Sequence, residues 1–537
     1  MTEKQPIYIM PENVSRTLGR DAQRNNILAA KVVADIVKTT LGPKGMDKML
    51  VDSAGNIIVT NDGVTILDEM EIDHPAAKMI VDITKTQESE VGDGTTTVAM
   101  LAGKLLENAE KLLDKRIHPT VIVKGYKLAA EKSKEYLEEI SFPVEDKEVL
   151  KNIAMTAMTG KGAEGNREKL SELIISAIDQ VGSGKDVNIE DIKIQKLKGD
   201  SVEDSELIRG VIIDKEAANE TMPKKVENAK IVLIDFPLEL KSPETETKIS
   251  VSTPEQLQSF IESEERILKE MTDKVINSGA NVVFCQKGID DVAQYYLAKA
   301  GIFACRRVAK SDMEKLARAT SSKIISNLEG LTEENFGYAE TVEEIKKGGD
   351  AMTYVKGCRN PKAVTILVRG STEHVVDETE RAIKDGLGDV VAAVKDGKVV
   401  AGGGAVEIEL ASRLRKFSRT LTGREQLAVE EFAQALESIP EALAENAGMD
   451  PINVLTELKQ KHESGLVKYG LNLFNSGIED CFAAGIIEPL KVKKQAISSA
   501  SEVATMILRI DDVLISSGSS SGAAGGGGMP SQFAGMD

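Results

Sequence analysis

Apolar residues recur at spacings of three and four through most of the first 140 residues, a pattern that predicts amphipathic helices. After Gly94, for example, Val98, Leu101 and Leu105 fall on one helix face. Helices are expected at residues 22–40, 75–90, 95–114 and 119–140, with a strand pair near 49–52 and 57–60. A second region, about 145–215, mixes helices with the loop Thr159-Gly160-Lys161-Gly162.

The pattern changes between about 207 and 370, where short apolar runs alternate with helical segments. This alternation indicates a separate α/β domain. The expected strands include Ile231–Phe236, Val282–Cys285 and Ala363–Val368, and the expected helices include Asp290–Ala300 and Met313–Thr320. Beyond residue 400 the pattern is helical again, starting with Gly402-Gly403-Gly404-Ala405 and a helix from Val406 to Lys416. We therefore expect one helical domain built from both chain ends, with other domains inserted into it.

Composition narrows the class of protein. A chain of 537 residues is too long for one hydrophobic core and implies roughly three or four domains. The net charge of −19 disfavours an electrostatic grip on nucleic acid or on an anionic membrane. The four cysteines are far apart, which argues against a zinc site or a disulfide framework and fits a reducing cytosol. Without a signal-peptide pattern or an apolar run near ~18 residues, we expect a soluble cytoplasmic protein.

A motif at residues 92–97 combines three properties that a nucleotide phosphate needs. Gly92 and Gly94 allow tight turns of the backbone, and Asp93 offers a hard oxygen ligand for Mg²⁺. Three threonines then open a predicted helix, whose free N–H groups and positive dipole end favour an anion. A plain turn followed by a threonine N-cap would produce the same pattern, so the motif alone does not decide.

Two upstream turns strengthen the phosphate interpretation. Leu41-Gly42-Pro43-Lys44-Gly45 follows a predicted helix, and Asn61-Asp62-Gly63 follows a predicted strand. Each turn is common when taken by itself. Two aspartates in glycine-flanked turns nevertheless fit a Mg–nucleotide site, where one carboxylate holds metal and another positions water. Because the Walker A pattern is absent, an ATP site here must be of another type.

Five motifs together resemble the chaperonin family. They are residues 41–45, 61–63, 92–97, 402–405 and 485–489, and they follow the family's order and spacing over nearly the whole chain. The middle of the chain resembles the group II branch, which comprises the archaeal thermosome and the eukaryotic cytosolic chaperonin. The chain as a whole is most similar to a thermosome subunit.

The resemblance implies a multidomain α+β and α/β fold with a helical equatorial domain from both chain ends, an inserted intermediate domain and an inserted α/β apical domain. The implied bounds are 1–145 and 402–520 (equatorial), 146–215 and 371–401 (intermediate), 216–370 (apical), 242–278 (helical protrusion or lid) and 521–537 (disordered tail). The implied function is an ATP-dependent chaperone, an ATPase with Mg²⁺. It would enclose unfolded proteins in a double ring of identical or homologous subunits.

The resemblance also implies roles for single residues. The nucleotide would be bound by Leu41, Gly42, Pro43, Gly94, Thr95, Thr96, Thr97, Gly160, Lys161, Gly403 and Glu488. Asp93 would ligate Mg²⁺, whereas Asp62 and Asp385 would orient the attacking water. Lys161 would sense the γ-phosphate, and Glu488 would accept hydrogen bonds from the ribose hydroxyls.

The second catalytic aspartate has two candidates, because the family's Asp-Ala-Leu pattern is not intact. Asp385 and Asp396 both precede the triple glycine. Spacing to Gly402 favours Asp385, and Asp396 fits a turn better. Gly386 stands where the family has alanine, which weakens a helix by about 1 kcal/mol and so bears on the hydrolysis rate.

Two further segments are expected to serve assembly and closure. Pro6–Met10 and a strand near Ile507–Leu514 have apolar content that suits edge pairing with a neighbouring subunit. The helix after Pro254 is amphipathic, with Phe260 and Leu268 on its apolar face, as a lid requires. A helix packed permanently on its own domain is the alternative.

Two other classes of function stay open. An ATP-dependent enzyme of actin-like or kinase type also uses Gly, Asp and Thr loops, although these usually join strands, whereas Gly94-Thr95 opens a helix. A ring scaffold without turnover has no chemical need for Asp62, Asp93 and Asp385 together. Microscopy of particle shape and an ATPase assay would separate these classes.

Overall fold

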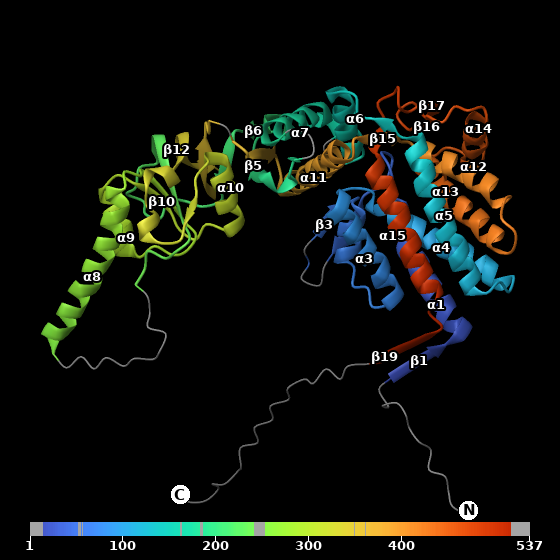
Figure 1. Ribbon diagram of the computed structural model, residues 1–537, viewed down its shortest axis with the longest axis horizontal. Coiled ribbons are helices and arrows are strands. Elements are labelled where there is room, and N and C mark those ends of the chain that lie inside the picture. Colours follow the sequence, from blue (N-terminus) through green and yellow to red (C-terminus); the bar gives the residue numbers. More distant parts are fainter. Residues whose placement is uncertain are drawn as a thin grey trace, which may run out of the picture.

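The computed structural model describes residues 14–51, 55, 57–161, 164–182, 186–240, 253–347, 350–359 and 361–516. These residues form a bent, elongated molecule with three parts (Figure 1). A helical body contains both ends of the described chain, a sheet unit lies at the far end, and a connecting unit lies between them. Among the described residues no helix combines the length and apolar character that a membrane crossing requires.

The helical body is built from the beginning and the end of the chain. Its helices are α1 (Gly19–Lys38), α2 (Gly63–Glu69), α3 (Pro75–Val91), α4 (Thr95–Asp114), α5 (Pro119–Ile140), α12 (Ala405–Ser418), α13 (Glu425–Asn446), α14 (Pro451–Glu463) and α15 (Leu490–Leu508). One hydrophobic core joins them, in which Leu101 of α4 and Ala500 of α15 are both fully buried. Tyr126 of α5 meets Phe432 of α13 edge to face at 5.6 Å. The two chain ends therefore share one core.

The connecting unit is also built from two stretches of chain. Its elements are α6 (Lys147–Met158), α7 (Arg167–Val181), β5 (Ile192–Lys198), β6 (Glu206–Ile208), β14 (Val364–Gly370) and α11 (Glu373–Asp396). The central strand β14 runs parallel to β5 and antiparallel to β6. Because β14 comes after the sheet unit and its neighbours come before it, the sheet unit is an insertion.

The sheet unit is a mixed sheet with helices beside it. Its elements are β7 (Gly210–Ile213), β8 (Lys225–Ile234), α8 (Pro254–Asn277), β9 (Val282–Cys285), α9 (Asp291–Lys299), β10 (Phe303–Cys305), α10 (Lys310–Thr320), β11 (Ile324–Ile325), β12 (Gly337–Lys347) and β13 (Asp350–Lys356). The strand order is β10-β9-β8-β12-β13-β7, and β11 also pairs with β8. Strands β8, β9 and β10 are parallel, as βαβ crossovers require. Helix α8 projects from the end of this unit (Figure 1).

Short strands fasten the remaining segments. They are β1 (Val14–Leu18) with β19 (Asp512–Ser516), the hairpin of β2 (Lys48–Val51) with β3 (Ile57–Thr60), the hairpin of β16 (Tyr469–Asn472) with β17 (Gly477–Asp480), and the sheet of β18 (Ile487–Pro489), β15 (Lys398–Ala401) and β4 (Phe142–Pro143). Strand β15 follows α11 directly and pairs with β18 and β4 on either side. The small β18-β15-β4 sheet therefore ties the connecting unit to the helical body.

Two details of the sequence-based prediction differ from the structure. The strand predicted near Ile507–Leu514 begins later than expected, because the three- and four-residue spacing of buried residues continues and Leu508 ends α15. The strand is β19, paired with β1 of the same chain. Asp396 is the last residue of α11 rather than part of a turn, since the left-handed Gly397 caps that helix.

Several predicted segments lie outside the described residues. These are Pro6–Met10, the tail after residue 516 and residues 242–252 of the expected lid. The rest of the expected lid is helix α8, in which Pro254 occupies the first turn and the Thr253 hydroxyl caps the Gln256 amide.

Candidate functional site

A cavity of about 210 Å³ lies where the helical body meets the connecting unit. Its wall is formed by the turns that follow α1 and precede α2, the α3–α4 loop, the C-terminal end of α6, the triple-glycine turn, the β16–β17 hairpin and the start of α15. All the predicted nucleotide- and metal-binding residues line this cavity, and so does Asp62. Asp385 does not line it.

One end of the cavity is suited to an anion. Gly92 ends α3 and Gly94 begins α4, both with left-handed φ angles (86° and 84°) that favour glycine. The Gln87 side chain donates to the Asp93 carbonyl at 2.9 Å and so holds the loop. Because Gly94 offers no side-chain cap, the first N–H groups of α4 face the cavity without an internal acceptor.

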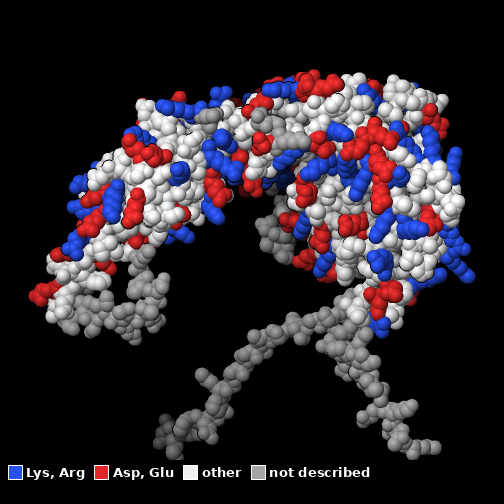
Figure 2. All heavy atoms as spheres, viewed as in Figure 1, with Lys and Arg blue, Asp and Glu red and all other residues white. Residues whose placement is uncertain are grey.

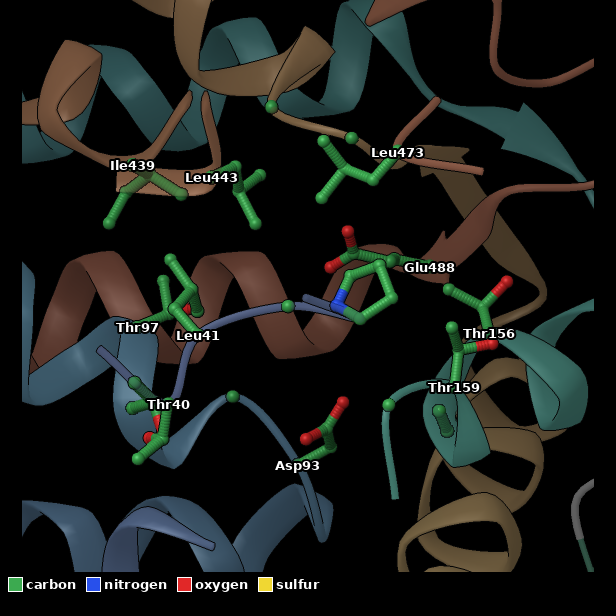
Figure 3. Close-up of a pocket in the computed structure, with 18 of the residues that line it drawn as sticks. Thr40, Leu41, Asp93, Thr97, Thr156, Thr159, Ile439, Leu443, Leu473 and Glu488 are labelled. Carbon is green, nitrogen blue, oxygen red and sulfur yellow. The ribbon is translucent and has the colours of Figure 1, made fainter. Parts of the chain in front are cut away.

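Two aspartates stand at the same end. The Asp93 carboxylate points into the cavity (Figure 3), and no hydrogen bond or ion pair joins it to another part of the described chain. Asp62 caps α2, and its Oδ2 accepts from the Thr65 amide at 2.9 Å and from the Thr65 hydroxyl at 2.7 Å. The Thr95 hydroxyl lies 3.5 Å from Asp62 Oδ1. Asp62 is therefore fixed in place, whereas Asp93 is available to a ligand.

Lys161 connects the cavity to the connecting unit. Its ammonium forms an ion pair with Asp385 of α11, and both side chains are largely buried. Burial raises the pKa of Asp385 to about 7; Lys161 opposes this rise, and the nearby Asp93 and Asp62 add to it. Burial alone would lower the pKa of Lys161, but Asp385 and Asp93 more than offset this, so the pKa is raised and the ammonium stays charged.

The opposite end of the cavity is apolar. Leu41, Ile439, Leu443 and Leu473 line it together (Figure 3). The backbone of Gly403 packs so closely that an added Cβ would lie 2.5 Å from the Leu471 carbonyl oxygen. A flat, weakly polar group fits this end, as a nucleotide base requires.

A carboxylate lies between the two ends. Glu488 of β18 reaches the cavity from the side opposite Asp93 (Figure 3). Its Oε2 is bound by the Lys493 ammonium at 2.6 Å. Burial raises the pKa of Glu488, while Lys493 lowers it.

Sequence reasoning missed a group of residues on this wall. They are Asn61, Thr156, Thr159, Ile439, Leu443, Leu471, Leu473, Phe474 and Lys493. The aliphatic members look like ordinary core residues in the sequence, and only the folded chain places them beside the glycine turns. Asn61 adjoins a predicted residue, and its amide donates to the Gly160 carbonyl at 2.6 Å.

This fold and this cavity define a chaperonin subunit. Residues 33–517 match the model of the TCP-1/cpn60 chaperonin family, and the chain belongs to that family. It is an ATP-dependent chaperone that uses ATP hydrolysis to drive protein folding.

Similar proteins place the chain in the group II branch. A thermosome subunit of Methanopyrus kandleri is 59% identical over 514 residues, which is 95% of this chain and 94% of the relative. The thermosome subunit beta of Methanothermobacter thermautotrophicus is 58% identical over 514 residues, covering 96% and 95%. The solved open-state monomer of a group II chaperonin from Methanococcoides burtonii is 50% identical. It covers 78% of this chain and 100% of its own, with a TM-score of 0.58.

Proposed function

We propose that the cavity binds Mg–ATP, with the phosphates at the α4 end and the base at the apolar end. The observation that carries this proposal is the convergence of a free helix N-terminus, Asp62, Asp93 and the Lys161 ammonium on one cavity. All six of the following residues line the cavity. Thr95, Thr96 and Thr97 would supply amides and hydroxyls for the phosphates. Leu41, Gly42 and Pro43 would contact the nucleotide.

The carboxylates present fit a Mg²⁺ ion. Asp93 supplies a hard oxygen of the kind that Mg²⁺ prefers, and no other described residue engages it. Mg²⁺ bound there would neutralise charge on the phosphates. Asp62, fixed by Thr65, is placed to orient a water molecule beside them.

Asp385 takes part through Lys161. In the structure Lys161 holds Asp385 away from the cavity wall. A γ-phosphate would offer Lys161 a second acceptor, so that the ammonium can turn toward the phosphate. We propose that this exchange frees the Asp385 carboxylate to accept a proton from the attacking water.

Nucleotide binding can be tested at Gly403, where the cavity wall packs closely against the Leu471 backbone. Gly403→Val puts a side chain against backbone that cannot move aside, so we expect it to abolish ADP binding measured by titration calorimetry. Gly165→Val is the matched control, because an added Cβ at Gly165 meets nothing within 4 Å. If a folded Gly403→Val variant binds ADP as tightly as wild type does, the assignment of this cavity is wrong.

The three parts fit the equatorial, intermediate and apical roles that the family implies. We propose that the helical body is equatorial, with bounds near 1–145 and 402–520. The connecting unit would be intermediate, with bounds near 146–208 and 364–401 rather than 146–215 and 371–401, because β14 pairs with β5 and β6. The sheet unit would be apical, with bounds near 210–356 rather than 216–370, because β7 pairs with β13 and β14 lies outside this sheet; α8 would be its protrusion.

We also propose that identical or homologous subunits form a double ring around unfolded clients. The β2–β3 hairpin exposes Met49, Val51 and Ile57 to at least half of their full area. The β1–β19 pair has a free edge on each side among the described strands. In a ring, the β2–β3 hairpin of one subunit could pair with the free edge of the β1–β19 pair of its neighbour. This pairing would cover the apolar hairpin and hydrogen-bond the free edge at the same time.

Light scattering tests this assembly. We expect a particle near a megadalton from subunits of 57.9 kDa. Val51→Glu should release smaller species, whereas Tyr295→Glu, at an exposed residue of the sheet unit, should leave the particle intact. A wild-type chain that stays monomeric at micromolar concentration, with and without nucleotide, would refute the ring.

We propose that α8 closes the ring as a lid. Phe260 and Ile261 near its outer end are about half exposed, whereas Leu268 and Val275 nearer the sheet are buried. The exposed residues would gain about 25 cal/mol for each Å² that neighbouring tips cover. Limited proteolysis at residues 242–270 should be fast without nucleotide and suppressed by ATP with a transition-state mimic. Equal cleavage in both conditions would rule out the lid.

A further inference from the structure

Three charged side chains form a buried cluster behind the ribose end of the cavity. Lys493 lies in the first turn of α15, and its Nζ is 2.9 Å from Glu407 Oε1 and 2.6 Å from Glu488 Oε2. The Lys493 and Glu407 side chains are 9% and 6% exposed. No expected role in nucleotide binding involves Lys493 or Glu407.

The two oxygens of Glu488 have different surroundings. Oε2 is taken by Lys493, which comes from the side of α15. Oε1 lies over the triple-glycine turn, where a Cβ at Gly402 would be 2.9 Å away from it. A side chain at Gly402 would therefore collide with this oxygen. Lys493 thus fixes the carboxylate plane, and Oε1 is left for a ligand that donates hydrogen bonds.

The cluster carries one negative charge in excess. Two carboxylates share one ammonium, and Glu407 Oε2 is buried without a hydrogen-bond partner among the described residues. Glu407 does not line the cavity, so Glu488 is the carboxylate that a ligand can meet, and the excess negative charge disfavours an anion there. Ribose hydroxyls are neutral donors that add no further negative charge, so they suit this site better than a phosphate does.

We propose that Lys493 is a positioning residue that makes Glu488 a selective acceptor for ribose hydroxyls, and that Glu407 holds Lys493 from behind. This inference rests on the proposed nucleotide site. Without Lys493 the buried Glu488 carboxyl would take up a proton and rotate freely. As a neutral acid it would no longer accept from both hydroxyls.

The test compares ADP with 2′,3′-dideoxy-ADP, which lacks both hydroxyls, by titration calorimetry on the assembled protein. Hydrogen bonds to a charged acceptor predict that wild type binds ADP roughly tenfold to a hundredfold more tightly than the dideoxy nucleotide. Lys493→Met should bring this ratio to within about threefold of unity while dideoxy-ADP affinity stays near wild type. A loss of affinity that is equal for both nucleotides would mean a merely structural role and would overturn the proposal.

A double-mutant cycle separates positioning from direct contact. Glu488→Gln alone should lower the ratio, and adding Lys493→Met should lower it no further, because Lys493 acts through Glu488. Additive effects would show that Lys493 works independently of Glu488 and would refute the proposal. Glu407→Gln, which keeps an acceptor for Lys493, should retain the ratio. If Lys493→Met does not fold, Glu407→Leu, which removes the acceptor behind Lys493, should lower the ratio, and an unchanged ratio in a folded Glu407→Leu variant would overturn the proposal.

Lys193→Met is the matched control for removing a buried lysine. Lys193 pairs with Asp312 at 2.7 Å, is similarly buried, and lies at the junction with the sheet unit. Its loss should leave the selectivity ratio unchanged. The proposed site and this inference can fail separately. A wild type that binds neither nucleotide contradicts the site, whereas one that binds both equally contradicts Glu488 as the ribose acceptor, and with it the role of Lys493, but leaves the cavity as the nucleotide site.

Discussion

Asp385 offers the sharpest test of the proposed chemistry. If it accepts the proton of the attacking water, Asp385→Ala should bind ATP but hydrolyse it about a thousandfold more slowly, since that factor corresponds to about 4 kcal/mol in the barrier. Asp396→Ala is the matched control, because Asp396 is an aspartate of the same helix placed at its far end. We expect the control to hydrolyse ATP at the wild-type rate.

The structure also sets the pH at which the reaction should begin. Burial with Asp93 and Asp62 nearby raises the pKa of Asp385 from 3.8 to about 7. The raised pKa means that the reactive, ionised form is lost as pH falls through about 7. About one-tenth of the free subunits would be ionised at pH 6, so kcat/KM should fall roughly tenfold there relative to its plateau.

Steady-state phosphate release between pH 5.5 and 8.5 measures this fall in kcat/KM on the acidic side. The fall in kcat/KM should disappear in the residual activity of Asp385→Asn, since an amide does not titrate. Wild-type turnover in Asp385→Ala together with slow turnover in Asp396→Ala would show that the wrong carboxylate has been chosen. If the fall in kcat/KM near pH 7 persists in Asp385→Asn, another group is responsible for the titration.

Three further outcomes are expected. Asp93→Ala should raise the Mg²⁺ concentration needed for nucleotide binding, measured by titrating Mg²⁺ at fixed ADP, and an unchanged requirement would exclude it as the ligand. Asp389 of α11 is 2% exposed and its pKa is raised well above the usual value by burial, so wild type loses stability as pH rises above about 4. Asp389→Asn should therefore raise the thermal midpoint more at pH 8 than at pH 5, and an equal shift at both would contradict this. Arg167 lies 4.8 Å above the Phe474 ring at the cavity wall, so Arg167→Ala should speed release of fluorescent ADP about two- to fivefold, whereas Arg359→Ala, which removes a similar pair elsewhere, should not.

The phosphate end of the site could be predicted from sequence because its residues are local. Gly92, Asp93 and Gly94 adjoin the helix that they serve, and α4 begins and ends where its apolar spacing predicts. Glycine turns and helix starts depend on nearby backbone, so a single stretch of sequence is enough to recognise them.

The base end could not be predicted in the same way. Ile439 and Leu443 belong to the apolar face of α13, and nothing in their spacing separates a core residue from a cavity residue. Lys493 and Glu407 look like solvated charges on two helices until the fold buries both. The pairing of Lys161 with Asp385 likewise depends on how α11 packs, which spacing alone does not determine.

The misplaced start of the strand near residue 507 has a simple physical reason. Val503, Ile507 and Leu508 are branched apolar residues, which favour strands as well as buried helix faces. The helix wins because these side chains pack into the core of the helical body. Tertiary burial thus outweighs the local preference at this point.

The shared core of the helical body has a consequence for the subunit's own synthesis. The sheet unit, from β7 to β13, is continuous in sequence and can close as soon as it leaves the ribosome. Helix α4 cannot, because α13 and α15, which cover its apolar face, are made last. Arg16 likewise waits for Asp512, its partner across the β1–β19 pair. Throughout translation the N-terminal helices therefore expose an uncovered apolar surface, and a chaperonin subunit is itself, until its last residues appear, a polypeptide that needs shielding from aggregation.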